Sequence, residues 1–532
     1  MNTINFTRRS FVQHLTVSTT VLFVAPCWAL GSENNASGTI RKAMDKAAKC
    51  CLAWLNPNQQ FLPAGGYEVA HDTGRWWDAM LRYEASTGIL IPKQAEDAMM
   101  QNLVMLTDNP AALLTSKLFN PHNLRETMLT YTALVNYRKS VWARVQGHKL
   151  IEIFISLIDT DGQLNYEKFA ELAGKPLTKD SLMQQMSPHG QWFNSTGSTG
   201  RAIEAIILFY QATGDDSALK LSKRLSEIHL QNDINVNGKV RSELLDPKSI
   251  GHNHSYFGTL RGLLLYGFAN GGEKYIEAIA NTYRKGIWGT SISYSGWTPH
   301  DQGKIRFPDK EGDPVGEHAS CGDVVQLALW LALRDGQTDL LDDVERLIRA
   351  RLLPSQIDNP SDPRRDGAWG VYNHPFGRGA ILDVFAAVLH SLTDVYQHIV
   401  TTAPDGNLSV NLHFDIDTSV VTVLSKRAEN ARLFVTPKQS VPLRIRVPAW
   451  ASRESVRLYL GNKALPLHWD GPYLVVRKKH ATAGKTIILQ HDLPKMETVE
   501  EMPVSHRKFY LSWRGDEVIA CEPKVEIYKA NS

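Results

Sequence analysis

The 532-residue chain has few cysteines, almost no net charge and no polybasic tract. Its five cysteines include no CxxC spacing, which argues against a disulfide scaffold and excludes a zinc ribbon. With a net charge of +3, nothing in the charge pattern indicates a nucleic acid partner. The apolar content of 43% is that of a globular protein long enough for one large domain and a smaller one.

Aromatic residues, in contrast, are plentiful. The chain has 13 tryptophans and 17 tyrosines. Such a surplus suits a polar cavity that binds sugar rings, and aromatic packing in a large core is the alternative.

The N-terminal segment has the pattern of an export signal. Arg8 and Arg9 precede a short apolar stretch, residues 15–25, which is too short to span a membrane. We therefore expect residues 1–30 to be a twin-arginine signal peptide, and the mature protein to be periplasmic or secreted without stable membrane insertion. Cys27 raises a lipoprotein alternative, but the proline before it fits a lipobox poorly.

Residues 38–400 have a helical periodicity that comes in pairs. An apolar helix, a short turn and a more amphipathic helix recur every fifty to seventy-five residues or so, which is typical of stacked helical hairpins. About six pairs fit, so we predict an (α/α)6 toroid as the catalytic domain. An open solenoid is the weaker alternative, because the long polar loops 289–316 and 354–379 favour a closed ring with loops around a cavity. The turns are expected at Thr87-Gly88, Thr213-Gly214, Asn270-Gly271 and Asp335-Gly336.

The periodicity changes to two after residues 401–406. Seven or eight short stretches of alternating apolar and polar residues follow, each bounded by Gly, Pro, Asp or Asn. We predict a β-sandwich over residues 405–530, so the whole protein is mainly α with a C-terminal β domain.

The stretch "GEHASCGD" holds four reactive side chains directly before an apolar run, residues 324–333. A helix without a polar face is buried, so Glu317, His318, Cys321 and Asp323 should open onto something internal. Asp323 has an alternative role as the N-cap of that helix.

Other polar groups recur at the starts of predicted inner helices. Because these starts meet at one end of a toroid, we expect a shared polar cavity there. Each single residue also has a simpler explanation, as a helix cap or a hydrogen-bonded core histidine. The groups are His71, Asp72, Arg75 and Trp76; His122, Arg125 and Glu126; His252, His254 and Arg261; and Asn373, His374 and Arg378.

Several motifs resemble the glycoside hydrolase family 127 group, the β-L-arabinofuranosidase-like proteins. "HDTGRWWDA" resembles that family's D-x-x-K-W-x-E-A segment, "LFYQATGD" its L-Y-R-x-T-G-D turn, and "LRIRVPAWA" its LRIPAWA strand. The resemblance covers most of the chain after residue 40. It implies an (α/α)6 barrel with a β-sandwich and a glycosidase activity.

The active-site motifs of that family match only in part. Glu317 is retained from G-E-T-C-A-S, but Ala319 occupies the place of a zinc-binding cysteine. The stretch "GVYNHPFGRG", where the nucleophilic cysteine would fall, has no cysteine, and Asp301 is the nearest acid to the family's acid/base glutamate. We therefore expect no bound zinc and no cofactor, with a set of His318, Cys321 and Asp323 as the alternative metal site.

Taken together, these patterns predict an exported glycoside hydrolase acting on plant or algal polysaccharide fragments, including uronic-acid-containing ones. Glu317 is the first catalytic candidate, kept protonated by burial, with Asp323 or Asp301 as its partner. His374 is a candidate for acid assistance. A polysaccharide lyase using "YNH" (residues 372–374) and a non-catalytic glycan-binding protein are the alternatives. The expected substrate-binding residues are His71, Asp72, Arg75, Trp76, His122, Arg125, Glu126, His252, His254 and His318, with Arg75 and Arg125 binding a uronate carboxylate.

Overall fold

The computed structural model describes residues 39–56, 62–63, 69–108, 122–172, 194–235, 237–247, 250–373 and 375–528. The predicted signal peptide and His374 lie outside these residues. Within them, no helix combines the length and the apolar character that a membrane span needs.

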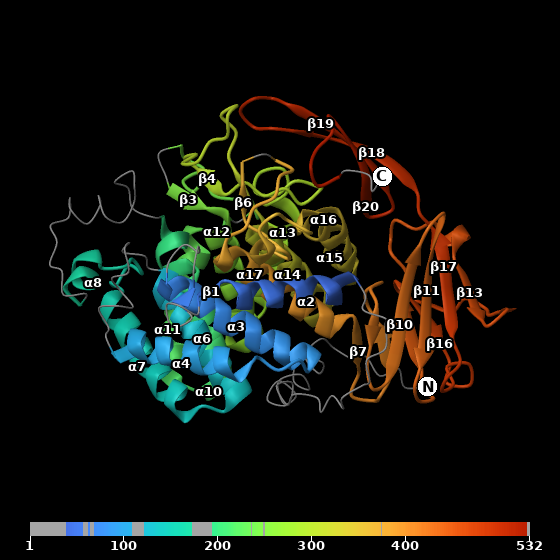
Figure 1. Ribbon diagram of the computed structural model, residues 1–532, viewed down its shortest axis with the longest axis horizontal. Coiled ribbons are helices and arrows are strands. Elements are labelled where there is room, and N and C mark those ends of the chain that lie inside the picture. Colours follow the sequence, from blue (N-terminus) through green and yellow to red (C-terminus); the bar gives the residue numbers. More distant parts are fainter. Residues whose placement is uncertain are drawn as a thin grey trace, which may run out of the picture.

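A closed ring of inner helices forms the larger domain (Figure 1). Each inner helix packs on the next along the chain, and α17 packs back on α3, which closes the ring. This closure confirms the predicted (α/α)6 toroid over the solenoid. The described inner helices are α3 (Val69–Thr87), α6 (His122–Arg138), α10 (Ala202–Thr213), α12 (Asn253–Tyr266), α14 (His318–Arg334) and α17 (Leu382–His398).

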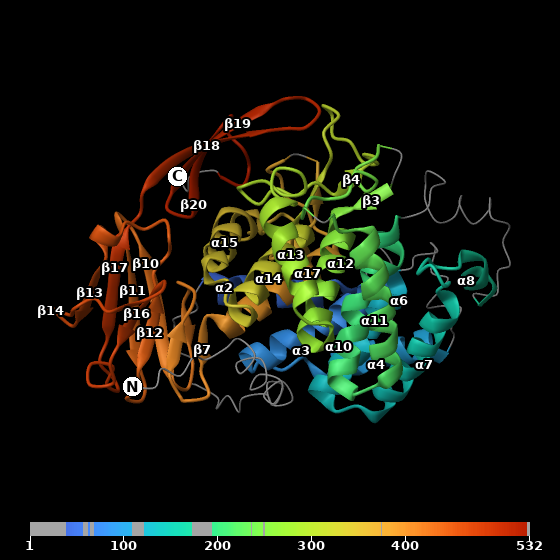
Figure 2. The same cartoon turned by 180° about the vertical axis from the view of Figure 1, so that it is seen from behind.

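Outer helices cover the ring, each against an inner neighbour (Figure 2). In α11 the buried positions recur every three or four residues, as an amphipathic helix requires. In α12, by contrast, every residue is buried. The outer helices are α2 (Thr39–Ala53), α4 (Lys93–Asp108), α7 (Val141–Leu157), α11 (Asp216–Asn232), α13 (Glu273–Lys285) and α15 (Leu341–Leu347), with the short α8 (Tyr166–Leu172) and α16 (Leu353–Ser355) beside them.

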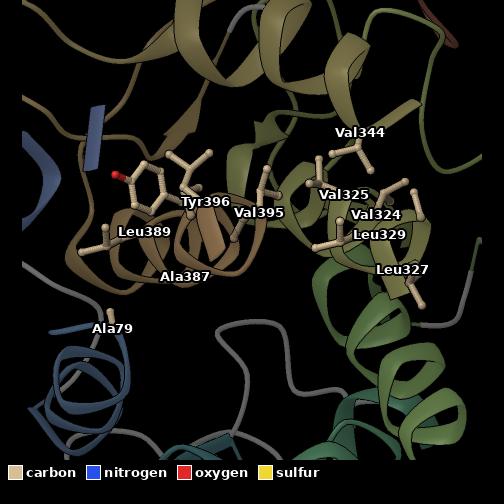
Figure 3. Close-up of a cluster of buried hydrophobic side chains, with 14 of the residues drawn as sticks. Ala79, Val324, Val325, Leu327, Leu329, Val344, Ala387, Leu389, Val395 and Tyr396 are labelled. Atoms are coloured by element: carbon tan, nitrogen blue, oxygen red, sulfur yellow. The ribbon is translucent and has the colours of Figure 1, made fainter. Parts of the chain in front are cut away.

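Apolar side chains of neighbouring inner helices fill the ring wall. Figure 3 shows one such cluster, in which Val344 of α15 lies close to Val324 and Val325 of α14, and side chains of α17 lie on the other side of α14 in the view. The labelled members from the two inner helices are Val324, Val325, Leu327, Leu329, Ala387, Leu389, Val395 and Tyr396, all buried.

Glycines in the left-handed conformation turn the chain between paired helices. Gly88, Gly214 and Gly336 have φ of 75°, 74° and 78°, at three of the four predicted turns. At the remaining turn the left-handed residue is Gly272 (φ 78°), one position later than expected. Nothing lies within 4 Å of a Cβ at these four positions, so backbone conformation alone favours glycine there.

The smaller domain is a β-sandwich, as predicted. Strand β11 alternates exposed and buried residues, and buried side chains of both sheets belong to one apolar core. One sheet has the order β14 (Lys463–Ala464), β13 (Arg457–Leu460), β17 (Ile487–Asp492), β11 (Asn430–Pro437), β10 (Val421–Arg427), β9 (Ile416–Asp417). The other has the order β15 (Trp469–Asp470), β16 (Tyr473–Val476), β12 (Leu443–Arg446), β8 (Leu408–Val410), β7 (Val400–Thr402).

The last strands leave the sandwich and form a sheet of their own, β18 (Lys495–Glu501), β19 (Lys508–Arg514) and β20 (Glu517–Glu522). This sheet lies along the toroid rather than with the sandwich (Figure 1). Its buried Phe509 contacts Phe376 of a toroid loop, with ring centroids 4.9 Å apart, within a shared apolar cluster. The range predicted for the sandwich, 405–530, therefore includes a separate sheet that packs on the toroid.

Short strands in the long loops form a platform at the N-terminal ends of the inner helices. These are β3 (Ile250–His252), β4 (Asp301–Gly303), β5 (Gly316–Glu317) and β6 (Val371–Tyr372). β3 pairs with β4 and β5 with β6, both antiparallel. Because β3 leads directly into α12 and β5 into α14, the platform fixes where both helices begin.

Candidate functional site

Polar side chains from the starts of the inner helices meet at one end of the ring, as predicted. Glu317 at the start of α14 contacts His252 at the start of α12, with Oε2 and Nε2 2.9 Å apart. His71 Nε2 of α3 lies 3.4 Å from Asp383 Oδ2 of α17. The sequence-distant groups are therefore neighbours in space.

Glu317 is the N-cap residue of α14 and is almost wholly buried. Its Oε2 accepts hydrogen bonds from His252 Nε2 and from Ser320 Oγ at 3.0 Å. Its backbone is held by Thr298, whose carbonyl accepts from Glu317 N at 3.1 Å and whose Oγ1 donates to Glu317 O at 2.6 Å. The carboxylate is therefore fixed in position from both its main chain and its side chain.

His300 and Asp301 lie beside this pair. The rings of His252 and His300 have centroids 4.4 Å apart, and His300 Nδ1 lies 2.8 Å from Asp301 Oδ1. Arg306 binds the same Asp301 carboxylate, with Nη2 2.7 Å from Oδ1. Although burial raises the pKa of Asp301, the hydrogen bonds and charges of His300 and Arg306 outweigh it and leave the pKa lowered. Asp301 is therefore an ionised, fully engaged carboxylate that orients His300.

The protonation state of Glu317 differs from the one expected. Burial raises the pKa of Glu317, but the charge and hydrogen bond of His252, with His300 and Ser320, outweigh burial and lower it to about 2. Burial lowers the pKa of His252 to about 4, despite the opposing effect of Glu317. Near neutral pH the pair is an ionised carboxylate and a neutral imidazole, so the expectation of Glu317 as a protonated general acid is wrong.

A buried network of charges lies beneath these residues, along the ring axis. Glu126 contacts Arg75, Arg125 and Arg201, with N–O distances of 2.9, 2.6 and 3.0 Å. Glu204 contacts Arg125 at 2.5 Å and Arg261 at 2.8 Å. Burial raises the pKa of both glutamates, but the arginines bring each down to about 2. These two glutamates bind four arginines, so the ion pairs hold the buried network together without neutralising all of its positive charge.

Arg75 and Arg125 are therefore not available for a uronate carboxylate. Both are buried, and each guanidinium already holds at least one carboxylate of the network. Arg75 Nη2 also lies 2.5 Å from His254 Nε2. The expected role of these arginines in substrate binding is wrong, because both guanidinium groups are buried and already bound to carboxylates inside the protein.

Asp323 lies inside α14, which begins at His318, so its alternative role as an N-cap is also wrong. Its Oδ2 lies 2.5 Å from His254 Nδ1, and its Oδ1 lies 3.2 Å from Arg261 Nη1. Burial raises the pKa of Asp323 to about 7 even though Arg261 opposes the shift. Burial and the nearby arginines Arg75 and Arg201 lower the pKa of His254 well below its usual range. Asp323 and His254 thus belong to the buried network and do not contact Glu317.

The remaining candidates are all buried. His122 accepts from Arg201 Nη1 at Nδ1 (2.9 Å) and faces the Gly197 carbonyl with Nε2 (3.0 Å). His318 faces the Gly370 carbonyl, with its ring 4.4 Å from that of Tyr372. Asp72 is buried in α3. Trp76 donates to the Cys51 carbonyl at 3.2 Å, so it packs between α2 and α3 as a buried core residue.

Three solved structures with the same architecture are glycoside hydrolases. A glycoside hydrolase is 13% identical, with a TM-score of 0.56, over 92% of this chain and 81% of that one. A GH127 β-L-arabinofuranosidase from Geobacillus stearothermophilus T6 is 11% identical, with a TM-score of 0.55, over 96% and 85% of the chains. The GH127 β-arabinofuranosidase BT3674 is 13% identical, with a TM-score of 0.56, over 97% and 83%. The chain has a GH127-like fold. No family model and no curated protein sequence matches it.

The cysteine-rich zinc site that a GH127-like fold implies does not fit the described residues. Their cysteines are Cys50, Cys51, Cys321 and Cys521, all free and buried. Cys321 is the one closest in sequence to Glu317, and burial raises the pKa of its thiol to about 12. His318, Cys321 and Asp323 do not form a metal-sized group either. Three thiolates cannot be assembled around Glu317.

The sequence did not single out His300 of the candidate site, nor Arg201, Glu204 and Asp383 at the starts of two inner helices. His300 directly precedes Asp301 in a loop, and this His-Asp dipeptide is the sequence feature that could have identified His300 as a candidate. Arg201 and Glu204 begin the inner helix α10 with the same charged pattern as the other helix starts. Asp383 does so for α17.

Proposed function

We propose that the protein is a glycosidase whose reaction centre is the platform around Glu317, and that it acts on oligosaccharide fragments of plant or algal polysaccharides. The observation that carries this proposal is the ionised Glu317, fixed against His252 beside His300 at the end of a ring where the inner helices begin. The GH127-like fold supports it, because the similar solved structures are glycoside hydrolases.

Glu317 acts in its ionised form. A fixed carboxylate stabilises the positive charge that develops on the sugar during glycosidic cleavage, and it can accept a proton from the attacking water. Ser320 and His252 hold its Oε2, so its orientation needs little change when the sugar binds. The proposal gives Asp301 a positioning function, because its carboxylate is engaged by His300 and Arg306.

The test is a screen of the purified protein on a panel of plant and algal oligosaccharides and aryl glycosides. We expect new reducing ends, one for each bond cleaved. In Glu317→Gln the charge is lost and the shape is kept, so turnover should fall about a hundredfold or more. Glu277→Gln, on the exposed face of outer helix α13, is the matched control and should keep full activity.

Other outcomes would replace the proposal. An ultraviolet-absorbing unsaturated product would identify a polysaccharide lyase, and saturable binding without cleavage would identify a glycan-binding protein. Among the described residues nothing favours the lyase specifically. Tyr372 is buried with its hydroxyl bound by Arg351, and burial raises its pKa to about 12 despite that arginine. Full activity in Glu317→Gln would place the centre elsewhere.

We also propose that the enzyme is exported, on the strength of Arg8 and Arg9 before a short apolar stretch. Export would bring the enzyme to oligosaccharide fragments that are released from polysaccharides outside the cell. Cell fractionation of the full-length protein tests this directly.

A further inference from the structure

We propose that His252, His300 and Glu317 form a binding site for one divalent transition-metal ion of the zinc type. One ligand atom from each of the three residues lies within 4.8 Å of the others. Two imidazoles and one carboxylate are a ligand set used for zinc at sites that keep a position open for water or substrate. The inference stands on this geometry and does not depend on which reaction the protein catalyses.

Nε2 of each imidazole is the nitrogen proposed to bind the metal. Because His252 Nε2 donates to Glu317, its proton must move to Nδ1, beside Ser255 Oγ, when a metal binds. His300 Nδ1 donates to Asp301 Oδ1 at 2.8 Å, which leaves the lone pair of Nε2. His252 Nδ1 lies 3.2 Å from Ser255 Oγ, and its Nε2 already faces Glu317. A carboxylate or hydroxyl on the remote nitrogen is the usual support of a metal-binding histidine, because it fixes the tautomer and the ring.

The three ligands are held by a small backbone framework. The segment 298–303 runs between β3 and β5 and is hydrogen-bonded to both. Asn253 N donates to the His300 carbonyl at 3.0 Å, and His300 N donates to the Val315 carbonyl at 2.7 Å. Glu317 N donates to the Thr298 carbonyl at 3.1 Å. Each of three adjacent extended segments thus supplies one ligand to the same face, so the ordering of the ligands is complete before a metal binds.

The distances agree with a site that closes on a metal by small movements. Metal bonds of about 2.0–2.2 Å in a tetrahedron place ligand atoms about 3.3 Å apart. His252 Nε2 and Glu317 Oε2 are already 2.9 Å apart. The remaining adjustment therefore falls mainly on His300, the most exposed of the three with 14% of its side chain accessible. Its exposure also provides the route by which an ion reaches the buried pair.

This ligand set explains how a metal can bind without cysteine. The expectation of no zinc rested on the missing thiols. Of the two zinc ligands in the family's G-E-T-C-A-S motif, Glu317 is the one that this chain retains. The two histidines come from the segments before α12 and before β4, far from that motif in sequence. A metal bound here would be coordinated by nitrogen and oxygen alone.

The experiment measures metal binding to the full-length mature protein, free of any histidine tag, in the absence of substrate. After chelation and dialysis, the protein is titrated with Zn²⁺ by calorimetry and with Co²⁺ by visible absorption. We expect about one ion per chain, and Co²⁺ bands without a thiolate charge-transfer band. Cys321→Ser should give the same spectrum. The exposed His468 in the sandwich provides the matched control, His468→Ala, which should bind normally.

Variants grade the contribution of each group. His300→Ala and Glu317→Gln should weaken binding by more than about a hundredfold, whereas Asp301→Asn, which removes only the support of His300, should weaken it about 10- to 100-fold. Far-ultraviolet circular dichroism verifies that each variant is folded, and His300→Ala perturbs the least buried ligand. Binding of less than one-tenth of an ion per chain for Zn²⁺ and Co²⁺, or unchanged affinity in His300→Ala, would overturn the site.

The same samples separate this inference from the proposed function. If the protein binds one metal ion but cleaves nothing on the glycan panel, the metal site is supported and the glycosidase proposal is refuted. If the protein cleaves glycans, binds no metal and keeps its activity in the presence of chelators, the glycosidase proposal is supported and the metal site is refuted.

Discussion

Removing the charge of Glu126 tests the buried network most directly, because this one carboxylate contacts three arginines. Burial alone would raise the pKa of Glu126, but Arg125, Arg75 and Arg201 lower it from 4.5 to about 2. At about 1.4 kcal/mol for each pKa unit, this difference corresponds to about 3 kcal/mol of folding free energy at neutral pH. That value agrees with the roughly 3–5 kcal/mol lost when one partner of a buried ion pair is removed. Glu126→Gln should therefore reduce the free energy of unfolding by about 3 kcal/mol at pH 7.

The loss should also depend on pH in a defined direction. The pKa of Glu126 is lower in the folded than in the unfolded protein, so its stabilisation is complete well above pH 4.5 and disappears as the pH falls through about 2. At pH 3.5 about 2 kcal/mol should remain. The difference between wild type and Glu126→Gln should thus shrink on acidification, because the wild-type carboxyl becomes protonated like the neutral amide.

The assay is urea unfolding followed by tryptophan fluorescence at pH 7 and at pH 3.5, with refolding on dilution to verify reversibility. Glu277→Gln, at an exposed position of α13, is the control and should change the free energy of unfolding by no more than about 0.5 kcal/mol. A loss below about 1 kcal/mol for Glu126→Gln at pH 7 would refute the reasoning. A difference between the two proteins that grows on acidification would refute it equally.

Three further predictions concern other parts of the molecule. Gly74→Ala should destabilise the protein by about 1–3 kcal/mol in the same unfolding assay, because the added Cβ would stand 2.6 Å from the backbone of Glu126 and force α3 away from α6. Glu317→Gln should lower turnover about a hundredfold with a much smaller change in KM, measured by reducing-sugar release. Replacing Arg8 and Arg9 together by lysine should leave the protein in the cytoplasm, and normal periplasmic recovery in cell fractions would contradict the twin-arginine assignment.

The fold could be predicted from the sequence because its signals are local. The long apolar runs of α12 and α14, and the period-two pattern of β11, are each contained in fewer than twenty consecutive residues. Closure of the ring by α17 on α3 was predicted only indirectly, from the number of helix pairs and from the long polar loops. The separate sheet of β18, β19 and β20 has the same period as the sandwich strands. Its packing on Phe376 of the toroid depends on contacts that no local pattern contains.

The place of the site was predictable, but its chemistry was not. Polar residues at the starts of inner helices meet because all inner helices of a toroid begin at the same end, so topology alone brought Glu317 and His252 together. Their protonation states depend on the contact itself. Burial of Glu317 was expected to keep it protonated, and that would hold for an isolated carboxyl. The hydrogen bonds of His252 and Ser320 reverse the outcome, and neither could be assigned as a partner from one sequence.

Contact partners cannot be assigned from one sequence, which also explains why Arg75 and Arg125 were expected to bind substrate and why His300 was not found. An arginine at a helix start predicts an anion nearby, but not whether that anion is a substrate or another side chain. For Arg125 the anions are Glu126 and Glu204, both inside the protein. His300 follows a loop without periodicity, so only the pairing of β3 with β4 reveals that it stands beside His252. The most informative residue of the platform is thus one that secondary-structure patterns cannot place. Its replacement by alanine is the variant that distinguishes a metal centre from a simple hydrogen-bonded cluster.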